Sequence, residues 1–124
     1  MKFAWVFVAY LSSACTTTDD RPATWSFIST AIVEPACGTA GCHSQWSQVS
    51  GLILDSREAG YKALVMSPAP DGNGPYVVAG SPDQSQLMYL LHGTEIRRMP
   101  PDAPLPAADI ELIETWITAG AKDN

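Results

Sequence analysis

The spacing of apolar side chains along the chain predicts short helices separated by irregular loops. A first helix is predicted over residues 24–33, and Pro35 ends or bends it because proline lacks an amide hydrogen. A second helix is predicted to begin at Asp55 or Ser56, either of which can cap it, and to run to about Val65. The apolar stripe of the first helix consists of Phe27, Ile28, Ala31 and Ile32.

Two further helices are predicted in the second half of the chain. Ser81-Pro82 predicts the start of a helix that continues through Leu90 and ends at His92-Gly93. The last helix is predicted to begin at Pro106 and to stop at Gly120. The residues expected on its buried side are Ile110, Leu112, Ile113, Trp116 and Ile117.

Between the helices the sequence predicts loops and one short extended stretch. Residues 67–74 are rich in glycine and proline and are expected to form a loop, and residues 76–79 are expected to be extended. No alternation of apolar and polar residues is long enough for a sheet. A chain of 124 residues fits one domain. We therefore expect an all-α fold of helices and long loops.

The first residues have the pattern of an export signal. Lys2 is followed by an unbroken apolar stretch over residues 3–11 and then by small residues. The apolar stretch is too short to span a bilayer as a helix. We expect residues 1–14 to be a signal peptide, residues 15–23 a tether that begins with a lipidated residue, and residues 24–124 the folded domain.

Cys15 directly follows this signal, and the ending Leu-Ser-Ser-Ala-Cys resembles a bacterial lipobox. In that motif the signal is removed before the cysteine, which then carries lipid. The resemblance implies a lipoprotein on the periplasmic side of a bacterial membrane, and a soluble periplasmic protein is the alternative. If Cys15 serves export, Cys37 and Cys42 remain as one pair among three cysteines.

The chain is acidic, which narrows the class of partner. It has 13 acidic and 7 basic residues, and its formal net charge is −6. A nucleic-acid-binding protein needs a basic face to neutralise phosphates, so nucleic acid is not expected as a partner. An acidic surface favours basic partners instead.

The segment from Cys37 to His43 is the most informative in the chain. It has two cysteines followed at once by a histidine, which is the attachment signal for c-type haem. The common form of this signal has two residues between the cysteines, and this segment has four. In such a signal both thiols bond to the porphyrin vinyl groups and the imidazole ligates the iron. We expect Cys37 and Cys42 to attach one haem c and His43 to be the proximal ligand.

Met99 is the leading candidate for the second axial ligand of the iron. It lies between Arg97-Arg98 and two prolines, which favour a rigid loop. A thioether suits iron, and a Met/His pair raises the haem potential. His92 is the competing candidate, whereas Met66 and Met88 lie in helical stretches and are expected in the core. The two arginines beside Met99 are candidates for pairing with a haem propionate.

The order of motifs resembles that of small exported c-type cytochromes. Over residues 24–121 the chain is similar to the cytochrome c-like domains of planctomycete and myxobacterial exported proteins. The motifs that carry the resemblance are Cys-x-x-x-x-Cys-His at 37–43, Ser-Pro-x-x-Ser-x-Leu at 81–87, Arg-Met-Pro-Pro at 98–101 and Leu-x-x-x-x-Ile-x-x-Ile-x-x-Trp-Ile-x-x-Gly-Ala at 105–121.

The resemblance implies a class I cytochrome c fold whose N- and C-terminal helices cross near the haem edge. It implies that Cys37 and Cys42 are the attachment thiols, that His43 is the proximal ligand and that Met99 is the distal ligand. Trp116 matches the aromatic residue of the terminal helix and is expected near the haem edge. Trp25 and Trp46 are also expected to be packing residues.

The function implied is that of a monohaem electron carrier, rather than an enzyme, that exchanges single electrons with redox partner proteins outside the cytoplasm. A haem sensor or enzyme with an open or labile distal position is one alternative. A lipoprotein module with a Cys37–Cys42 disulfide and no haem is another. A zinc site is a poorer explanation, because its fourth ligand would have to be His92 or a scattered carboxylate.

Overall fold

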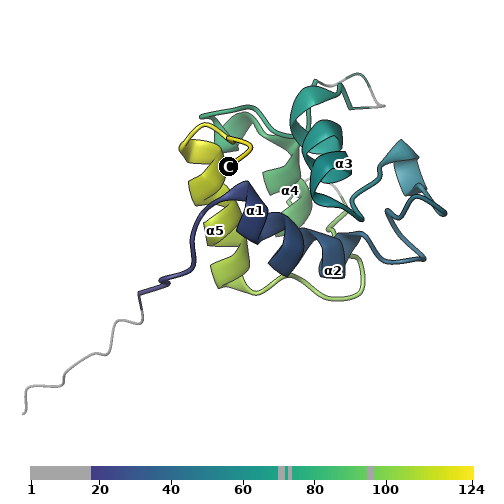
Figure 1. The fold of residues 1–124 in the computed structure, drawn as a ribbon, viewed down its shortest axis with the longest axis horizontal. Helices are drawn as coiled ribbons and strands as arrows, with labels where there is room; N and C mark the ends of the chain where they lie inside the picture. The colour runs from purple at the N-terminus through teal and green to yellow at the C-terminus, as the bar shows by residue number, and fades with distance from the viewer. Residues whose placement is uncertain (1–17, 70–71, 73, 95–96) are drawn as a thin grey trace, which may run out of the picture.

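The structure, a computed structural model, describes residues 18–69, 72, 74–94 and 97–124 (Figure 1). The predicted signal peptide and the predicted lipidation site Cys15 lie outside the described residues. The described part is all-α, as predicted, and contains no strand beyond one isolated bridge between Pro68 and Pro75. Its elements are α1 (Trp25–Ile28), η1 (Ser29–Val33), α2 (Glu34–Cys37), η2 (Val49–Gly51), α3 (Arg57–Tyr61), η3 (Lys62–Met66), η4 (Pro82–Gln84), α4 (Gln86–His92) and α5 (Ala107–Thr118).

The first helix is longer than predicted, because Pro35 does not end it. α1, the π-helical turn η1 and α2 follow one another without a break from Trp25 to Cys37. Pro35 lies in the first turn of α2, directly after the π-helical turn, whose wider backbone accommodates a residue that lacks an amide hydrogen. As a result the first cysteine of the motif is the last residue of a helix rather than part of a loop.

The second helix begins where the sequence predicts. The hydroxyl of Ser56 accepts the amide hydrogen of Ala59 at 3.3 Å and so caps α3. Asp55, the other candidate cap, accepts the amide hydrogen of Gln45 at 2.7 Å instead. One side chain therefore starts the helix while its neighbour binds the loop that follows the cysteine motif.

The third predicted helix begins later than expected. A single 3-10 turn, η4, comes first, and α4 starts only after Ser85. Ser85 is fully buried, and its hydroxyl accepts the amide hydrogen of Val78 and donates to the carbonyl of Ser81, both at 2.9 Å. These bonds hold the chain in a turn where the prediction had a helix. α4 ends at His92 as predicted, since Gly93 adopts the left-handed conformation with φ 69°.

α1 and α5 pack against each other in the core (Figure 1). The indole rings of Trp25 and Trp116 are stacked, with 5.0 Å between centroids. Both rings are fully buried, and their N–H groups donate to the carbonyls of Arg57 and Lys122 at 2.9 Å and 2.8 Å. The predicted inner face of α5 is confirmed, since the buried residues are Ile110, Leu112, Ile113, Trp116 and Ile117.

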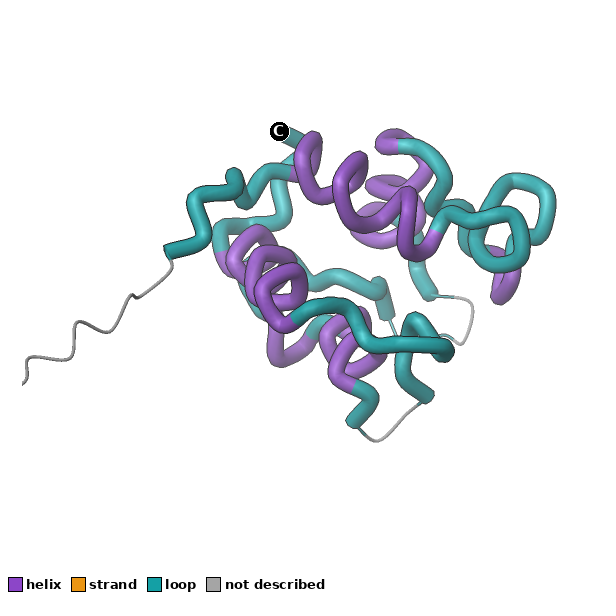
Figure 2. Tube along the Cα trace, turned by 90° about the horizontal axis from the view of Figure 1, so that it is seen from below, coloured by secondary structure: helices purple, strands orange, loops and turns teal. Residues whose placement is uncertain are grey.

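Some residues predicted to pack in the core are exposed. Trp46 is 85% exposed and Met66 is 71% exposed, so both predictions are wrong, whereas Met88 is buried as predicted. Ala31 of the first helix is also exposed. Met66 is the last residue of η3, beyond the stretch that packs on the core, and Trp46 lies in the loop after α2. In Figure 2 this loop lies at the end of the molecule opposite the N-terminal segment.

Candidate functional site

The loop that follows α2, here called the motif loop (residues 38–51), is folded back on itself by backbone hydrogen bonds. The amide of His43 donates to the carbonyl of Cys37 at 3.0 Å, which brings the histidine backbone beside the first cysteine. Inside the spacer the amide of Cys42 donates to the carbonyl of Thr39, also at 3.0 Å. The four-residue spacer is thus taken up by a tight turn and does not hold the ends of the motif apart.

Gly38 lets the motif loop lie directly against the segment that precedes α3. A Cβ atom at Gly38 would stand 2.6 Å from the carbonyl oxygen of Leu54 and 2.7 Å from the Cα of Asp55. The same two segments are joined by a hydrogen bond from the amide of Leu54 to the carbonyl of His43 at 2.6 Å. A Cβ at Gly41 would meet nothing within 4 Å. Only the first glycine of the spacer is therefore required for close packing.

The imidazole of His43 is oriented by the backbone. Its Nδ1 lies 2.8 Å from the carbonyl oxygen of Val49. Because a carbonyl can only accept, Nδ1 carries the hydrogen and Nε2 keeps its lone pair in the neutral ring. A hydrogen bond of this kind is the usual support of a metal-ligating histidine. Val49 is itself held in place, since its amide donates to the carbonyl of Cys42 at 3.1 Å.

Cys37 and Cys42 are both half-buried free thiols. Cys37 packs against the core at the end of α2. Burial raises the pKa of the Cys37 thiol to about 11, and the neighbouring Cys42 adds to the effect. In the part of the chain that the structure describes, no group of three or more His, Cys, Asp and Glu side chains could hold a metal ion.

Met99 lies on the connection from α4 to α5 and is half-buried. Its amide donates to the carbonyl of Leu90 at 2.8 Å, which holds the connection against α4. The side chain of Arg98 lies close to Gly93, while Arg97 is exposed. Among the described residues, the backbone hydrogen bond of Met99 runs to α4 and not to the motif loop, so the pairing of Met99 with His43 stays a prediction.

His92, the competing ligand, lies in a different place from the motif. It is exposed at the end of α4 and lines a groove to which Asp83, Tyr89 and Glu114 also contribute. No residue of the motif loop lines this groove. His92 therefore shares its surroundings with carboxylates of η4 and α5 rather than with the cysteines.

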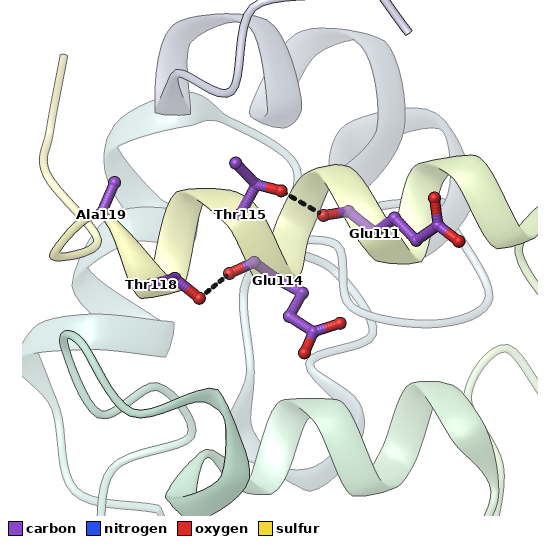
Figure 3. A pocket seen from close by; sticks show the side chains of 5 residues that line it. All are labelled: Glu111, Glu114, Thr115, Thr118 and Ala119. Atoms are coloured by element: carbon purple, nitrogen blue, oxygen red, sulfur yellow. Dashed lines mark hydrogen bonds between the residues drawn. The ribbon is translucent and has the colours of Figure 1, made fainter. Parts of the chain in front are cut away.

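A further hollow lies on the exposed side of α5 and contains none of the predicted site residues (Figure 3). Its two hydroxyl groups are already engaged in the helix, since Thr115 and Thr118 each donate at 2.8 Å to a backbone carbonyl one turn earlier. The residues that line it are Glu111, Glu114, Thr115, Thr118 and Ala119. Its hydroxyl groups are used within α5, and none of the residues predicted to bind haem contributes to it.

A family model described as planctomycete cytochrome C matches residues 40–103, which is just over half of the chain. The chain belongs to the planctomycete cytochrome c family. The matched range includes Cys42, His43 and Met99 and begins after Cys37. Membership places this cytochrome in the class of haem-binding electron carriers. Comparisons with curated proteins and with solved structures give no match.

Among the described residues, Val49 contributes to the candidate site of the cytochrome in a way that the sequence did not reveal. Its contribution is a backbone carbonyl, and a carbonyl has no signature in the sequence. Gly38 and Gly41 both belong to the cysteine motif, and the sequence does not distinguish them. The structure does, because only Gly38 lies against the backbone of Leu54. In the described part of the cytochrome, no helix is both long and apolar enough to cross a membrane.

Proposed function

We propose that this cytochrome is an exported, lipid-anchored monohaem protein that moves single electrons outside the cytoplasm. Cys37 and Cys42 would hold the haem through thioether bonds, and His43 and Met99 would be its axial ligands. The observation that carries the proposal is the hydrogen bond from His43 to Val49, which leaves Nε2 available on the motif loop, where Cys42 also lies, while the Cys37 thiol lies at the end of α2 from which this loop leaves. The residues present therefore fit a c-type haem.

The protein's part in the function is to hold the cofactor rigidly and to control the iron ligands. When bound, the haem supplies an iron that accepts and returns one electron. The Val49 carbonyl fixes the plane of the His43 ring and increases the basicity of its Nε2. Cys37 offers an attachment point fixed to the core, while buried Leu52 and Leu54 provide apolar surroundings beside the motif loop.

Met99 is supported as the distal ligand over His92 by the surroundings of the two side chains. Met99 is half-buried on a segment that is hydrogen-bonded to α4. His92 is exposed in a groove with Asp83 and Glu114. A histidine and methionine pair gives a closed, six-coordinate iron of the kind used for electron transfer, because no coordination position is left for a substrate.

The membrane anchor is the part of the proposal that rests on the sequence. Cys15 would carry the lipid, and the tether would connect it to the domain. Where the tether becomes described, Arg21 forms ion pairs with Asp19 at 2.7 Å and with Asp109 of α5 at 2.6 Å. These contacts support a tether that is held at the start of α5 before it leaves the domain.

The test is to produce the full chain in a host that matures c-type cytochromes and to record a pyridine haemochrome spectrum and an intact mass. We expect one haem per chain, bound covalently, with a spectrum that shifts when Cys37→Ser or Cys42→Ser removes one of two thioethers. A colourless protein with the mass of the polypeptide alone would overturn the proposal. A high-spin ferric spectrum would overturn Met99 ligation and indicate an open distal position.

Cys15→Ala should move the protein from the membrane fraction to the soluble fraction.

A further inference from the structure

Trp46 stands out from the surface of the motif loop. It lies three positions after His43 and is 85% exposed, and Val49, on the same loop, is 45% exposed. Large apolar side chains exposed to water on one loop are typical of interaction sites, and tryptophan is among the residues most enriched where binding energy is concentrated.

The backbone beneath Trp46 is held by hydrogen bonds, so the exposure of this side chain is built into the loop. The buried hydroxyl of Ser44 accepts the amide hydrogens of Trp46 and Ser47, both at 3.3 Å. Ser47 in turn donates to the carbonyl of Cys42 at 2.7 Å, and Gln45 is tied to Asp55. A side chain presented by an ordered backbone loses little further entropy when it binds, which favours affinity.

Val49 connects the iron ligand to this surface. Its carbonyl accepts the hydrogen of His43 Nδ1, while its own side chain faces solvent. Only Val49 and its hydrogen bond to His43 would lie between the ligand imidazole and a protein that contacts the side chain of Val49. This position suits electron exchange better than either of the two hollows that involve α5, which contain no motif residue.

The same surface belongs to the part of the chain that lacks charge. No residue from 35 to 54 is Asp, Glu, Lys or Arg, although the chain as a whole carries a formal net charge of −6. The exposed neighbours of Trp46 are uncharged residues, namely Gln45, Gln48, Ser50 and Gly51. The Asp55 carboxylate also reaches this loop, but it is bound there by the amide hydrogen of Gln45. A partner with a strongly charged docking face would therefore find few complementary charges here, so the surface is suited to an uncharged one.

We propose that Trp46 and Val49 form the docking surface for an electron-transfer protein whose own docking face is uncharged and apolar. The inference rests on the proposed function, because electron exchange requires the haem. It differs from the expectation, drawn from net charge alone, that partners should be basic, since the charge of the whole chain does not describe the surface beside the haem motif.

The test measures electron transfer by stopped flow from the haem-loaded full chain to two probes. The first probe is a small blue-copper protein with an uncharged apolar rim at its copper, and the second is a c-type cytochrome with a lysine-ringed haem edge. We expect Trp46→Ala to lower the second-order rate with the first probe about tenfold, the effect of losing roughly 1.4 kcal/mol at the interface. That rate should change little with salt, whereas the rate with the second probe should fall as salt is added.

Met66→Ala is the matched control, because Met66 is also apolar and highly exposed but lies outside the charge-free segment. It should leave both rates unchanged. The absorbance spectrum and reduction potential of Trp46→Ala must also be unchanged. An altered spectrum or potential would overturn the inference by showing that Trp46 packs on the haem, and an unchanged rate with the first probe would overturn it as well. Absence of haem would instead refute the proposed function, so the two failures are distinguishable.

Discussion

Gly38 and Gly41 lie in the same spacer, yet their surroundings differ. Gly38 has φ −79°, a value open to any residue, so only the available space decides whether it can be replaced. The space is closed by the backbone of Leu54 and Asp55, which cannot move aside like a flexible side chain. The spacer therefore contains one position under steric constraint and one without.

Replacement of Gly38 by alanine should destabilise the domain by about 1–3 kcal/mol, the usual effect of forcing a methyl group into packed surroundings. Gly41→Ala should change the free energy of unfolding by no more than about 0.5 kcal/mol. Urea unfolding of both variants with haem attached, alongside the haem yield, makes the comparison. Equal stability of the two variants would contradict the close approach seen at Gly38.

At Met99 the expected effect concerns the iron rather than the stability of the fold. Met99→Leu should abolish the weak absorbance band at the red edge that marks iron–sulfur ligation. It should also lower the reduction potential by on the order of 0.1 V, within the range of ~0.8 V that axial ligands span. Met66→Leu, at an exposed methionine, is the control and should change neither quantity. If the iron–sulfur band is absent from the unaltered protein and His92→Ala converts a low-spin spectrum to a high-spin one, His92 is the distal ligand instead.

At the scale of elements, the sequence predicted helix features correctly where neighbouring residues along the chain determine them. Ser56 caps α3, Gly93 ends α4, and the apolar period of α5 gives its buried face. The expected helix end before Pro35 was wrong, since a π-helical turn precedes this proline and the helix continues. The expected helix start at Ser81-Pro82 was wrong because the hydroxyl of Ser85 accepts the amide hydrogen of Val78. Both failures depend on hydrogen bonds that the amino-acid order does not display.

The pairing of α1 with α5 depends on Trp116, which makes it a sensitive position. Trp116→Ala should lower the free energy of unfolding by about 3–5 kcal/mol, because it leaves a cavity against Trp25 and removes the bond to the Lys122 carbonyl. The same substitution at exposed Trp46 should lower it by no more than about 0.5 kcal/mol. Denaturant unfolding at equal haem content compares the pair, and similar losses at both positions would contradict the packing described for Trp116.

At the scale of the whole molecule, Asn124 is hydrogen-bonded to the first turn of α1. Thr24 makes no side-chain cap for α1. The first amide hydrogens of α1 are taken up by Asn124 instead, whose side-chain oxygen accepts from Trp25 at 3.1 Å and whose main-chain oxygen accepts from Ser26 at 2.8 Å. An ion pair between Arg57 and Asp123 at 2.6 Å lies at the same junction.

Asn124→Ala should therefore act like the loss of a helix cap and destabilise the domain by about 1 kcal/mol. For a domain of about 100 residues this corresponds to a fall in Tm of about 4 °C. Lys122→Ala is the matched control, because its exposed side chain can be removed while its carbonyl remains for Trp116. Scanning calorimetry of the haem-loaded proteins measures both, and no difference between the two would refute a capping role for Asn124.

The sequence alone determined the chemical groups and the periodic elements of this cytochrome. Cysteines, a histidine and a methionine can be read directly, and so can the 3.6-residue period of α5, because these properties belong to single residues or to neighbours along one helix. The tertiary structure alone decided that the Val49 carbonyl orients His43, that Gly38 meets Leu54 and that Trp46 faces solvent. These facts depend on which distant segments of the chain come into contact when it folds. Burial and hydrogen bonds between residues far apart in the sequence arise only from such contacts.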